Sequence, residues 1–264
     1  MNPIWLISIL LGWMAFWLWF VYWFQPWLDR RCGDGPITGF LWITGKLYSR
    51  LIHRVRYVGF ENLPPELCFG SQKPVIVIAN HTAGIDPVIL QTGLHRHLRW
   101  FMWAGNMHPA LDWAWKHEKM IPVNYGASDD AIALRVATRH LRAGGALGIF
   151  PEGAIARPPK DLRPFQPGVA LLARLGKAPI AMFWIHDTPY TESAWGSLFQ
   201  RSHSVIEFLG MKDFSRSKDP EGVAEQLRLI YAERSGWTLN EESLANAQAM
   251  QGENTSDQSA TGVG

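Results

Sequence analysis

Apolar positions dominate the first part of the chain without interruption. Residues 4–24 are mostly apolar, and residues 1–28 contain no Asp, Glu, Lys or Arg. As a helix, a run of this length spans about 30 Å, the thickness of a bilayer core. We therefore predict a membrane-anchoring helix. A cleaved signal peptide and a buried core helix are the alternatives, but the run has no basic flank before it and no small-residue cleavage site after it.

A second apolar stretch, residues 37–58, carries interspersed basic residues. Its apolar positions recur at mixed helical spacings, which predicts a second helix that returns into the membrane or lies on its surface. An amphipathic helix packed on the protein core is the alternative. The pattern fits a single membrane span and a re-entrant pair of helices equally.

From residue 59 onward, short apolar runs alternate with amphipathic stretches. Runs rich in β-branched or aromatic residues and bounded by turn residues predict strands, and apolar residues at helical spacing predict helices. This alternation indicates an α/β fold with a mixed, mainly parallel sheet flanked by helices. The predicted strands are 74–80, 97–105, 121–126, 146–153, 178–186 and 202–210, and the predicted helices are 86–98, 110–120, 128–145, 167–177 and 220–236.

Two of these helices have clear start signals, and the chain divides into three parts. Asp86 is a predicted cap with Pro87 at the first helical position, and Ser128 is a predicted cap for the helix at 128–145. The last 26 residues are polar and nearly free of large apolar side chains, which predicts disorder. The predicted parts are a membrane-anchoring helical segment (1–56), an α/β domain (57–238) and a disordered tail (239–264).

Composition and charge exclude some functions and suggest a location. The net charge is only +2, and no basic run interleaved with aromatic residues is present, which argues against a nucleic-acid partner. Cys32 and Cys68 form neither a disulfide framework nor a metal site. Basic residues outnumber acidic ones between residues 29 and 56, so the positive-inside rule places the body of the chain in the cytoplasm. Six tryptophans within the first 28 residues also suit a membrane interface.

Candidate chemistry begins where the strand predicted at 74–80 ends, in the sequence Asn80-His81-Thr-Ala-Gly-Ile-Asp86. A histidine at the carboxyl end of a strand can act as a general base if a carboxylate orients its ring. Five residues along a regular helix would turn Asp86 away from His81, but a loop through Gly84 can fold it back. The alternative is a strand end followed by an ordinary helix start, without catalysis.

A second strand end carries a similar arrangement. The sequence Phe150-Pro-Glu-Gly follows the apolar run at 146–149, and Arg157 comes shortly after it. Glu152 beside a flexible glycine, Gly153, suits a pocket for a polar substrate. Taken alone, Pro-Glu-Gly is also a plain turn.

Together the two sequences resemble the 1-acylglycerol-3-phosphate acyltransferases, the PlsC-like family of glycerolipid acyltransferases. Asn80-His81 with Asp86 matches the family's first motif, Asn-His-x4-Asp, and residues 150–153 match its third motif, Phe-Pro-Glu-Gly. The order of the motifs, their separation of 71 residues and the apolar beginning of the chain agree with the family. The resemblance covers residues 58–185.

The resemblance implies an O-acyltransferase that uses an acyl thioester, either acyl-CoA or acyl-carrier protein, as co-substrate. His81 would be the general base and Asp86 would orient it, while Glu152, Gly153 and Arg157 would bind substrate. It implies no metal, no cofactor and no acyl-enzyme. Membrane lipids would be the acceptor and the product.

The sequence departs from the family where the acceptor's phosphate is recognised. Arginines are usual in the second motif and after Glu-Gly in the third, whereas this chain has Asn124-Tyr125 and Ala154-Ile155 there. Tyrosine and isoleucine cannot replace arginine's bidentate fork. Two interpretations follow: nearby basic residues take over this role, or the acceptor is an aminolipid, glycolipid or lipid alcohol without a phosphate in that place. The candidate basic residues are Arg157, Lys160 and Arg163.

Two other classes of function stay open beside acyl transfer. One is a catalytically silent lipid-binding protein on the same fold, which would have no need for both His81 and Asp86. The other is a metal-dependent hydrolase. His95 and His97 are too poorly spaced for a shared metal on a helix, and His117-Glu118 lacks a second histidine.

Overall fold

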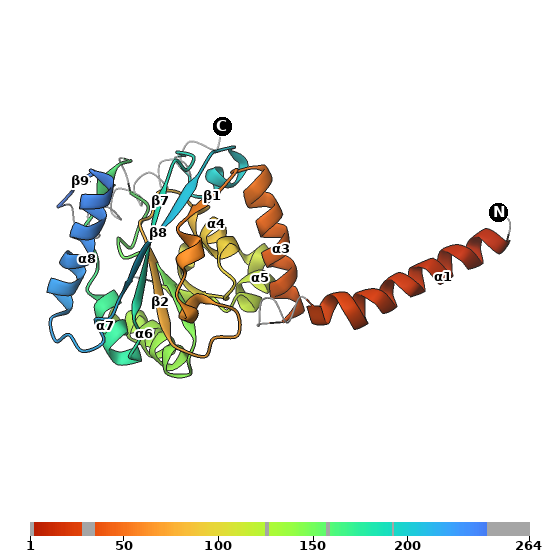
Figure 1. Cartoon of the computed structure of the whole chain (residues 1–264), viewed down its shortest axis with the longest axis horizontal. Helices are drawn as coiled ribbons and strands as arrows, with labels where there is room; N and C mark the ends of the chain where they lie inside the picture. The colour runs from red at the N-terminus through yellow and green to blue at the C-terminus, as the bar shows by residue number, and fades with distance from the viewer. Residues whose placement is uncertain (1–2, 28–34, 125–126, 157–158, 192, 242–264) are drawn as a thin grey trace, which may run out of the picture.

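The computed structural model describes residues 3–27, 35–124, 127–156, 159–191 and 193–241. Helix α1 (Pro3–Trp19) continues into the π-helical segment η1 (Phe20–Phe24) and extends away from the body of the molecule (Figure 1). Within the described ranges, Ile7–Trp27 is the one helix long and apolar enough to span a bilayer, and none of it is buried. A signal sequence would pass the same test, so this finding supports a membrane anchor only by length and composition.

Seven strands form the central sheet, in the order β1-β8-β7-β2-β5-β3-β4. Neighbouring strands are parallel except β7 and β8, which are antiparallel. The predicted fold class, a mixed and mainly parallel sheet flanked by helices, is therefore confirmed. The strands are β1 (Arg56–Val58), β2 (Val75–Ala79), β3 (Arg99–Trp103), β4 (Ile121–Val123), β5 (Ala146–Ile149), β7 (Ile180–His186) and β8 (Val205–Lys212).

Helices cover both faces of this sheet (Figure 1). Helices α6, α7 and α8 lie on one side, and α3, α4 and α5 lie on the other. β2 shows why both faces need cover, because Ile76 and Ile78 enter one core cluster while Val75 and Val77 enter the other. The helices are α3 (Pro36–Leu51), α4 (Asp86–Gly93), α5 (Asp112–His117), α6 (Ala127–Arg142), α7 (Gly168–Gly176) and α8 (Pro220–Ser235). Short 3₁₀ turns are η2 (Phe60–Asn62), η3 (Pro65–Leu67), η4 (Ala104–Asn106), η5 (Pro109–Leu111) and η6 (Trp195–Phe199).

The segment predicted as one helix over residues 37–58 is corrected. The helix ends at Leu51, and residues 56–58 form the edge strand β1, which pairs with β8. α3 packs on α4, where Thr92 donates a hydrogen bond to Ser49 Oγ at 3.0 Å. Its other face leaves apolar side chains exposed: Ile37, Phe40, Leu47 and Leu51. The helix is therefore amphipathic and packed on the body along one side only.

Two predicted helix starts differ in the structure. Asp86 does not cap α4, because Ile85 holds the N-cap position and no side chain bonds there. α6 begins at Ala127, one residue before the predicted cap, and the side chain of Ser128 is outside the described part of the structure. The carboxylate of Asp86 is used elsewhere, as described below.

A small second sheet ties the chain after α8 to the loop after β5. It pairs β6 (Asp161–Leu162) with β9 (Thr238–Leu239) in parallel. Arg228 in α8, which is buried, donates through Nη2 to the carbonyls of Leu162 and Asn240, at 3.1 and 2.9 Å. The predicted tail therefore begins too early, since Leu239 and Asn240 are hydrogen-bonded; residues 242–264 lie outside the described residues.

Candidate active site

The carboxyl ends of β7, β2 and β5 lie side by side, and β2 ends in a buried amide. Asn80 Nδ2 donates to the carbonyl of Ile185 at 2.7 Å, and the N–H of Ile185 donates to Asn80 Oδ1 at 2.7 Å. The side chain thus continues the strand pairing where the backbones separate. Asn80 is fully buried, so it holds the start of the loop that carries His81.

His81 and Asp86 meet through the loop, as the loop interpretation expects. Nδ1 of His81 lies 3.0 Å from Oδ2 of Asp86. The same carboxylate accepts the backbone N–H groups of Thr82 and Ala83, at 2.6 and 2.8 Å. An ionised carboxylate only accepts hydrogen bonds, so Nδ1 carries its hydrogen and Nε2 is left with a lone pair. Asp86 is fully buried, and the His81 side chain is 16% exposed. Nε2 is therefore a ring nitrogen that can accept a proton, on a partly exposed imidazole whose other nitrogen is held by Asp86.

Gly84 permits this loop for a reason other than unusual backbone angles. Its φ is not among the positive values, which corrects the expectation from sequence. Instead, the backbone of Ala194 lies against it, so a Cβ at this position would come within 2.2 Å of the Ala194 carbonyl oxygen. Thr188 reaches the same loop by donating a hydrogen bond to Thr82 Oγ1 at 2.7 Å. The segment after β7 thus packs directly on the His81–Asp86 loop.

We expect Gly84→Ala to lower the free energy of unfolding by about 1–3 kcal/mol, because backbone atoms must move to admit the methyl group. Urea unfolding followed by tryptophan fluorescence measures this change. Gly168→Ala is the matched control, since a Cβ at position 168 meets nothing within 4 Å. Equal stability of the two variants would contradict the close approach.

Glu152 lies beneath His81 and contacts its backbone. The N–H of His81 donates to Glu152 Oε1 at 2.9 Å, and the N–H of Arg163 lies 3.5 Å from Oε2. Burial raises the pKa of the Glu152 carboxyl to about 8, although both N–H groups act in the opposite direction. Only 1% of the Glu152 surface is exposed, and its hydrogen bond with the backbone of His81 connects the third motif to the first within the protein interior.

The raised pKa of Glu152 makes stability depend on pH. Between about 4.5 and 8 the folded chain holds this proton while the unfolded chain releases it, so stability falls as the pH rises. A glutamine stays neutral throughout. We expect the stability of Glu152→Gln relative to the wild type to increase by about 3 kcal/mol from pH 5 to pH 8.

Urea unfolding in detergent at both pH values measures this difference. Glu221→Gln is the control, because Glu221 is exposed at the start of α8. A stability difference between Glu152→Gln and the wild type that does not change with pH would exclude a buried, proton-binding Glu152.

The other predicted site residues lie on the same loop or beyond the described part. Gly153 has a φ of +74° and donates its N–H to the Phe150 carbonyl at 3.0 Å, so it closes the turn. Ala156 N–H donates to the His81 carbonyl at 2.8 Å, which ties the loop to the histidine a second time. Arg157 and Tyr125 lie outside the described residues. Lys160 is exposed and Arg163 is buried.

One contact that the sequence did not reveal is aromatic. The His81 ring stacks on Phe150, with centroids 4.0 Å apart and planes inclined by 12°. Trp100 in β3 stacks on Phe150 in turn, at 5.2 Å and 19°. The sequence shows Phe150 only as part of a motif, because its contact with His81 depends on the order of the strands in the sheet.

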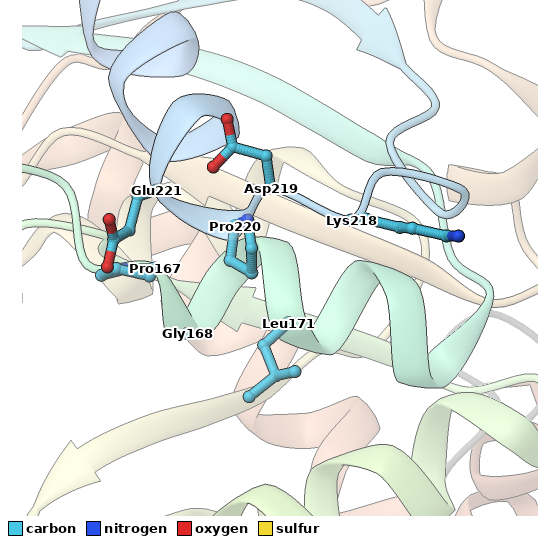
Figure 2. Close-up of a pocket in the computed structure, with 7 residues that line it drawn as sticks. All are labelled: Pro167, Gly168, Leu171, Lys218, Asp219, Pro220 and Glu221. Atoms are coloured by element: carbon cyan, nitrogen blue, oxygen red, sulfur yellow. The ribbon is translucent and has the colours of Figure 1, made fainter.

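Two other features lie apart from these residues. A groove lies between the first turns of α7 and α8, and its lining includes none of the predicted site residues (Figure 2). Among the residues that the structure describes, no three His, Cys, Asp or Glu side chains gather as metal ligands. His97 Nε2 instead lies 2.9 Å from Glu118 Oε2, before β3. The absence of a metal from the reaction stays a prediction.

A histidine paired with a carboxylate at the carboxyl ends of the strands is an arrangement that can take a proton from a hydroxyl or from water. The family model "Acyltransferase" matches residues 54–186, half of the chain, so the chain belongs to the acyltransferase family. This match confirms the enzyme class expected from the motifs.

A solved structure shares the fold. It is the 1-acyl-sn-glycerophosphate (LPA) acyltransferase PlsC from Thermotoga maritima, with a TM-score of 0.61 and 18% sequence identity. The similarity covers 75% of this chain and 77% of that one. No match was found among curated proteins.

Proposed function

We propose that this chain transfers a fatty acyl group from acyl-CoA or acyl-carrier protein to the hydroxyl of a lysophospholipid such as 1-acylglycerol-3-phosphate. The observation that carries the proposal is the fixed His81 ring, with Nδ1 3.0 Å from the buried Asp86 carboxylate. The family match and the fold of the Thermotoga maritima enzyme support the same reaction.

The proposed reaction needs one proton carrier. His81 Nε2 takes the proton of the acceptor hydroxyl while the oxygen attacks the thioester carbonyl carbon. The tetrahedral intermediate then collapses, the carbon–sulfur bond breaks, and the imidazolium returns its proton to the leaving thiolate. The products are the acylated lipid and a free thiol. Asp86 holds the ring orientation and stabilises the imidazolium while it exists.

We propose supporting roles for the other predicted residues. Glu152 fixes the backbone of His81, from which it accepts a hydrogen bond at 2.9 Å. Gly153 closes the turn that follows Glu152, and we assign it to substrate binding. Arg157 and Lys160 are the candidates for recognition of an acceptor phosphate, since the positions of the family's arginines are Tyr125 and Ile155.

A membrane location accompanies the lipid substrates. We propose that α1 anchors the chain and that the exposed apolar face of α3 rests on the same membrane surface. Basic residues follow the first apolar run, and under the positive-inside rule they support a catalytic domain on the cytoplasmic side. Membrane lipids are then both the source of the acceptor and the destination of the product.

A second candidate acceptor is favoured by one specific observation. The absence of arginine at positions 125 and 155 removes the usual phosphate fork, which suits an aminolipid, a glycolipid or a lipid alcohol. A catalytically silent lipid-binding protein is the remaining alternative.

The test is acyl transfer by membranes that contain the full chain, with membranes carrying His81→Ala as control. Labelled acyl-CoA and labelled acyl-carrier protein are supplied in separate reactions with a panel of lyso-lipids. Labelled phosphatidate that requires His81 supports the phosphate acceptor, and label only in another lipid supports the second candidate. If neither donor gave a product that depends on His81, the catalytically silent lipid-binding protein would be the remaining interpretation. Activity that survives chelation of metal ions would exclude a metal-dependent hydrolase.

A further inference from the structure

Three aromatic rings form a continuous stack at the candidate site. The His81 imidazole and the Phe150 ring are nearly parallel, with centroids 4.0 Å apart. Trp100 is also nearly parallel to Phe150, at 5.2 Å. Trp100 is 3% exposed, so the stack begins in the core and ends at the partly exposed histidine.

The order of the strands explains this stack. β5 lies between β2 and β3, so Phe150 at the end of β5 lies between His81 and Trp100. Gly148 makes room for Trp100, because a Cβ there would come within 2.5 Å of the indole ring. The paired positions of Trp100 and Gly148 in the parallel ladder place the indole across β5. Phe150 is therefore stacked against one ring from the β2 side and one from the β3 side of β5.

The contact has a geometric consequence for His81. Asp86 fixes Nδ1 within the plane of the imidazole, but a single hydrogen bond permits the ring to tilt about it. Phe150 fixes the plane itself. The two contacts together determine where Nε2 points, and a general base must present its lone pair to the substrate hydroxyl within hydrogen-bond distance.

The contact also has an electrostatic consequence. The face of an aromatic ring attracts a cation within about 6 Å of its centroid, and the attraction is stronger where water is excluded. His81 is neutral before the reaction and becomes a cation while it holds the proton of the acceptor. Phe150 therefore stabilises the charged form that exists only during the reaction, which is the condition for lowering the barrier.

We propose that Phe150 is a positioning residue for the general base, and that its ring face both orients the imidazole of His81 and stabilises the imidazolium. This inference rests on the proposed function for its catalytic part. In the described part of the chain, Asp86 in α4 and Glu152 after β5 contact His81 directly. Arg163 after β6 interacts with Glu152, and His53 after α3 interacts with Asp86. All four keep their identity in the variants below.

The test compares Phe150→Leu with Phe150→Tyr in the full chain, reconstituted in lipid nanodiscs. Leucine removes the ring face, and tyrosine keeps it. Phe208→Leu is the matched control, since Phe208 is also partly buried against the same core cluster but contacts the Phe183 ring rather than His81. If the leucine variant fails to fold, Phe150→Met gives the same comparison with a longer side chain.

Two readouts separate a role in catalysis from a purely structural one. For Phe150→Leu, we expect kcat to fall about tenfold with KM unchanged, because the proposed contact of Phe150 is with the general base and not with the substrate. The acid limb of its pH–rate profile moves about 0.5–1 unit to lower pH, because the imidazolium has lost a stabilising contact. Phe150→Tyr and Phe208→Leu keep the wild-type limb.

NMR of ring-labelled histidine measures the same titration without any enzymatic reaction. The signal that disappears in His81→Gln identifies the residue, and its titration midpoint in Phe150→Leu is expected to move to lower pH. An unmoved or raised midpoint in a folded variant would overturn the inference. A lowered midpoint in a chain without acyl-transfer activity would uphold the electrostatic contact and refute the proposed function.

Discussion

Acyl transfer by His81→Gln is expected to fall about 1,000-fold or more, while the protein stays folded. The amide of glutamine cannot take a proton from the acceptor hydroxyl, and general-base catalysis by a positioned side chain contributes about 10²–10⁴ to a rate. The side chain of His81 is partly exposed, so its replacement leaves no large cavity in the core. Single-turnover transfer from a labelled acyl thioester, measured in detergent or in membranes, gives the rate directly.

A second histidine–carboxylate pair provides the control for this result. His97 Nε2 lies 2.9 Å from Glu118 Oε2. His97 precedes β3 and so lies near the amino ends of the parallel strands, whereas His81 follows β2 at their carboxyl ends. His97→Gln should retain the wild-type rate. If His81→Gln also retained it, His81 would not be the base and the proposed mechanism would fail.

The second large effect is expected for Asp86→Asn, which should lose about 10³–10⁴ in rate. The Oδ2 atom of Asp86 receives the backbone N–H groups of Thr82 and Ala83 as well as His81 Nδ1. An asparagine carbonyl can keep some of these bonds, but its amide also presents hydrogens toward the loop. It carries no charge to stabilise the imidazolium. The ring would then adopt the other tautomer or turn away.

Asp86→Asn should also lower the free energy of unfolding, by about 1–3 kcal/mol, because the hydrogen bonds of a fully buried acceptor are altered. The rate and the stability are measured on the same preparation. In the double variant with His81→Gln, the loss of rate should not exceed that of His81→Gln alone, since the two residues act as a unit. Additive losses would show that Asp86 contributes independently of His81.

The fold follows from the sequence wherever a buried strand is long enough to show its pattern. β2, β5 and β7 consist almost entirely of buried apolar residues, so the residues themselves indicate a sheet covered on both faces. β1 has only three residues and an exposed–intermediate–exposed pattern, so its pairing with β8 leaves no mark in the local sequence. The same holds for β6 and β9, which have two residues each.

The candidate site was predictable only in its local part. The proximity of His81 and Asp86 depends on five residues of one loop, and the sequence motif contains both. The contact of Glu152 with the backbone of His81 joins residues 71 positions apart, and no local pattern specifies it. The stack through Phe150 needs three neighbouring strands in a particular order. Long-range geometry of this kind becomes visible only when the sheet is assembled.

The hydrogen bonds of Arg228 have a practical consequence for protein engineering. The Arg228 guanidinium in α8 donates to the carbonyls of both Leu162 and Asn240. Leu162 is followed by Arg163, whose N–H lies near the Glu152 carboxyl. Deleting residues from position 238 onward would remove the strand that pairs with β6. It would also remove two acceptors of the buried Arg228 guanidinium, the Asn240 carbonyl and Glu241 Oε1. Shortened chains for expression or crystallisation should therefore retain Glu241, and affinity tags belong after it.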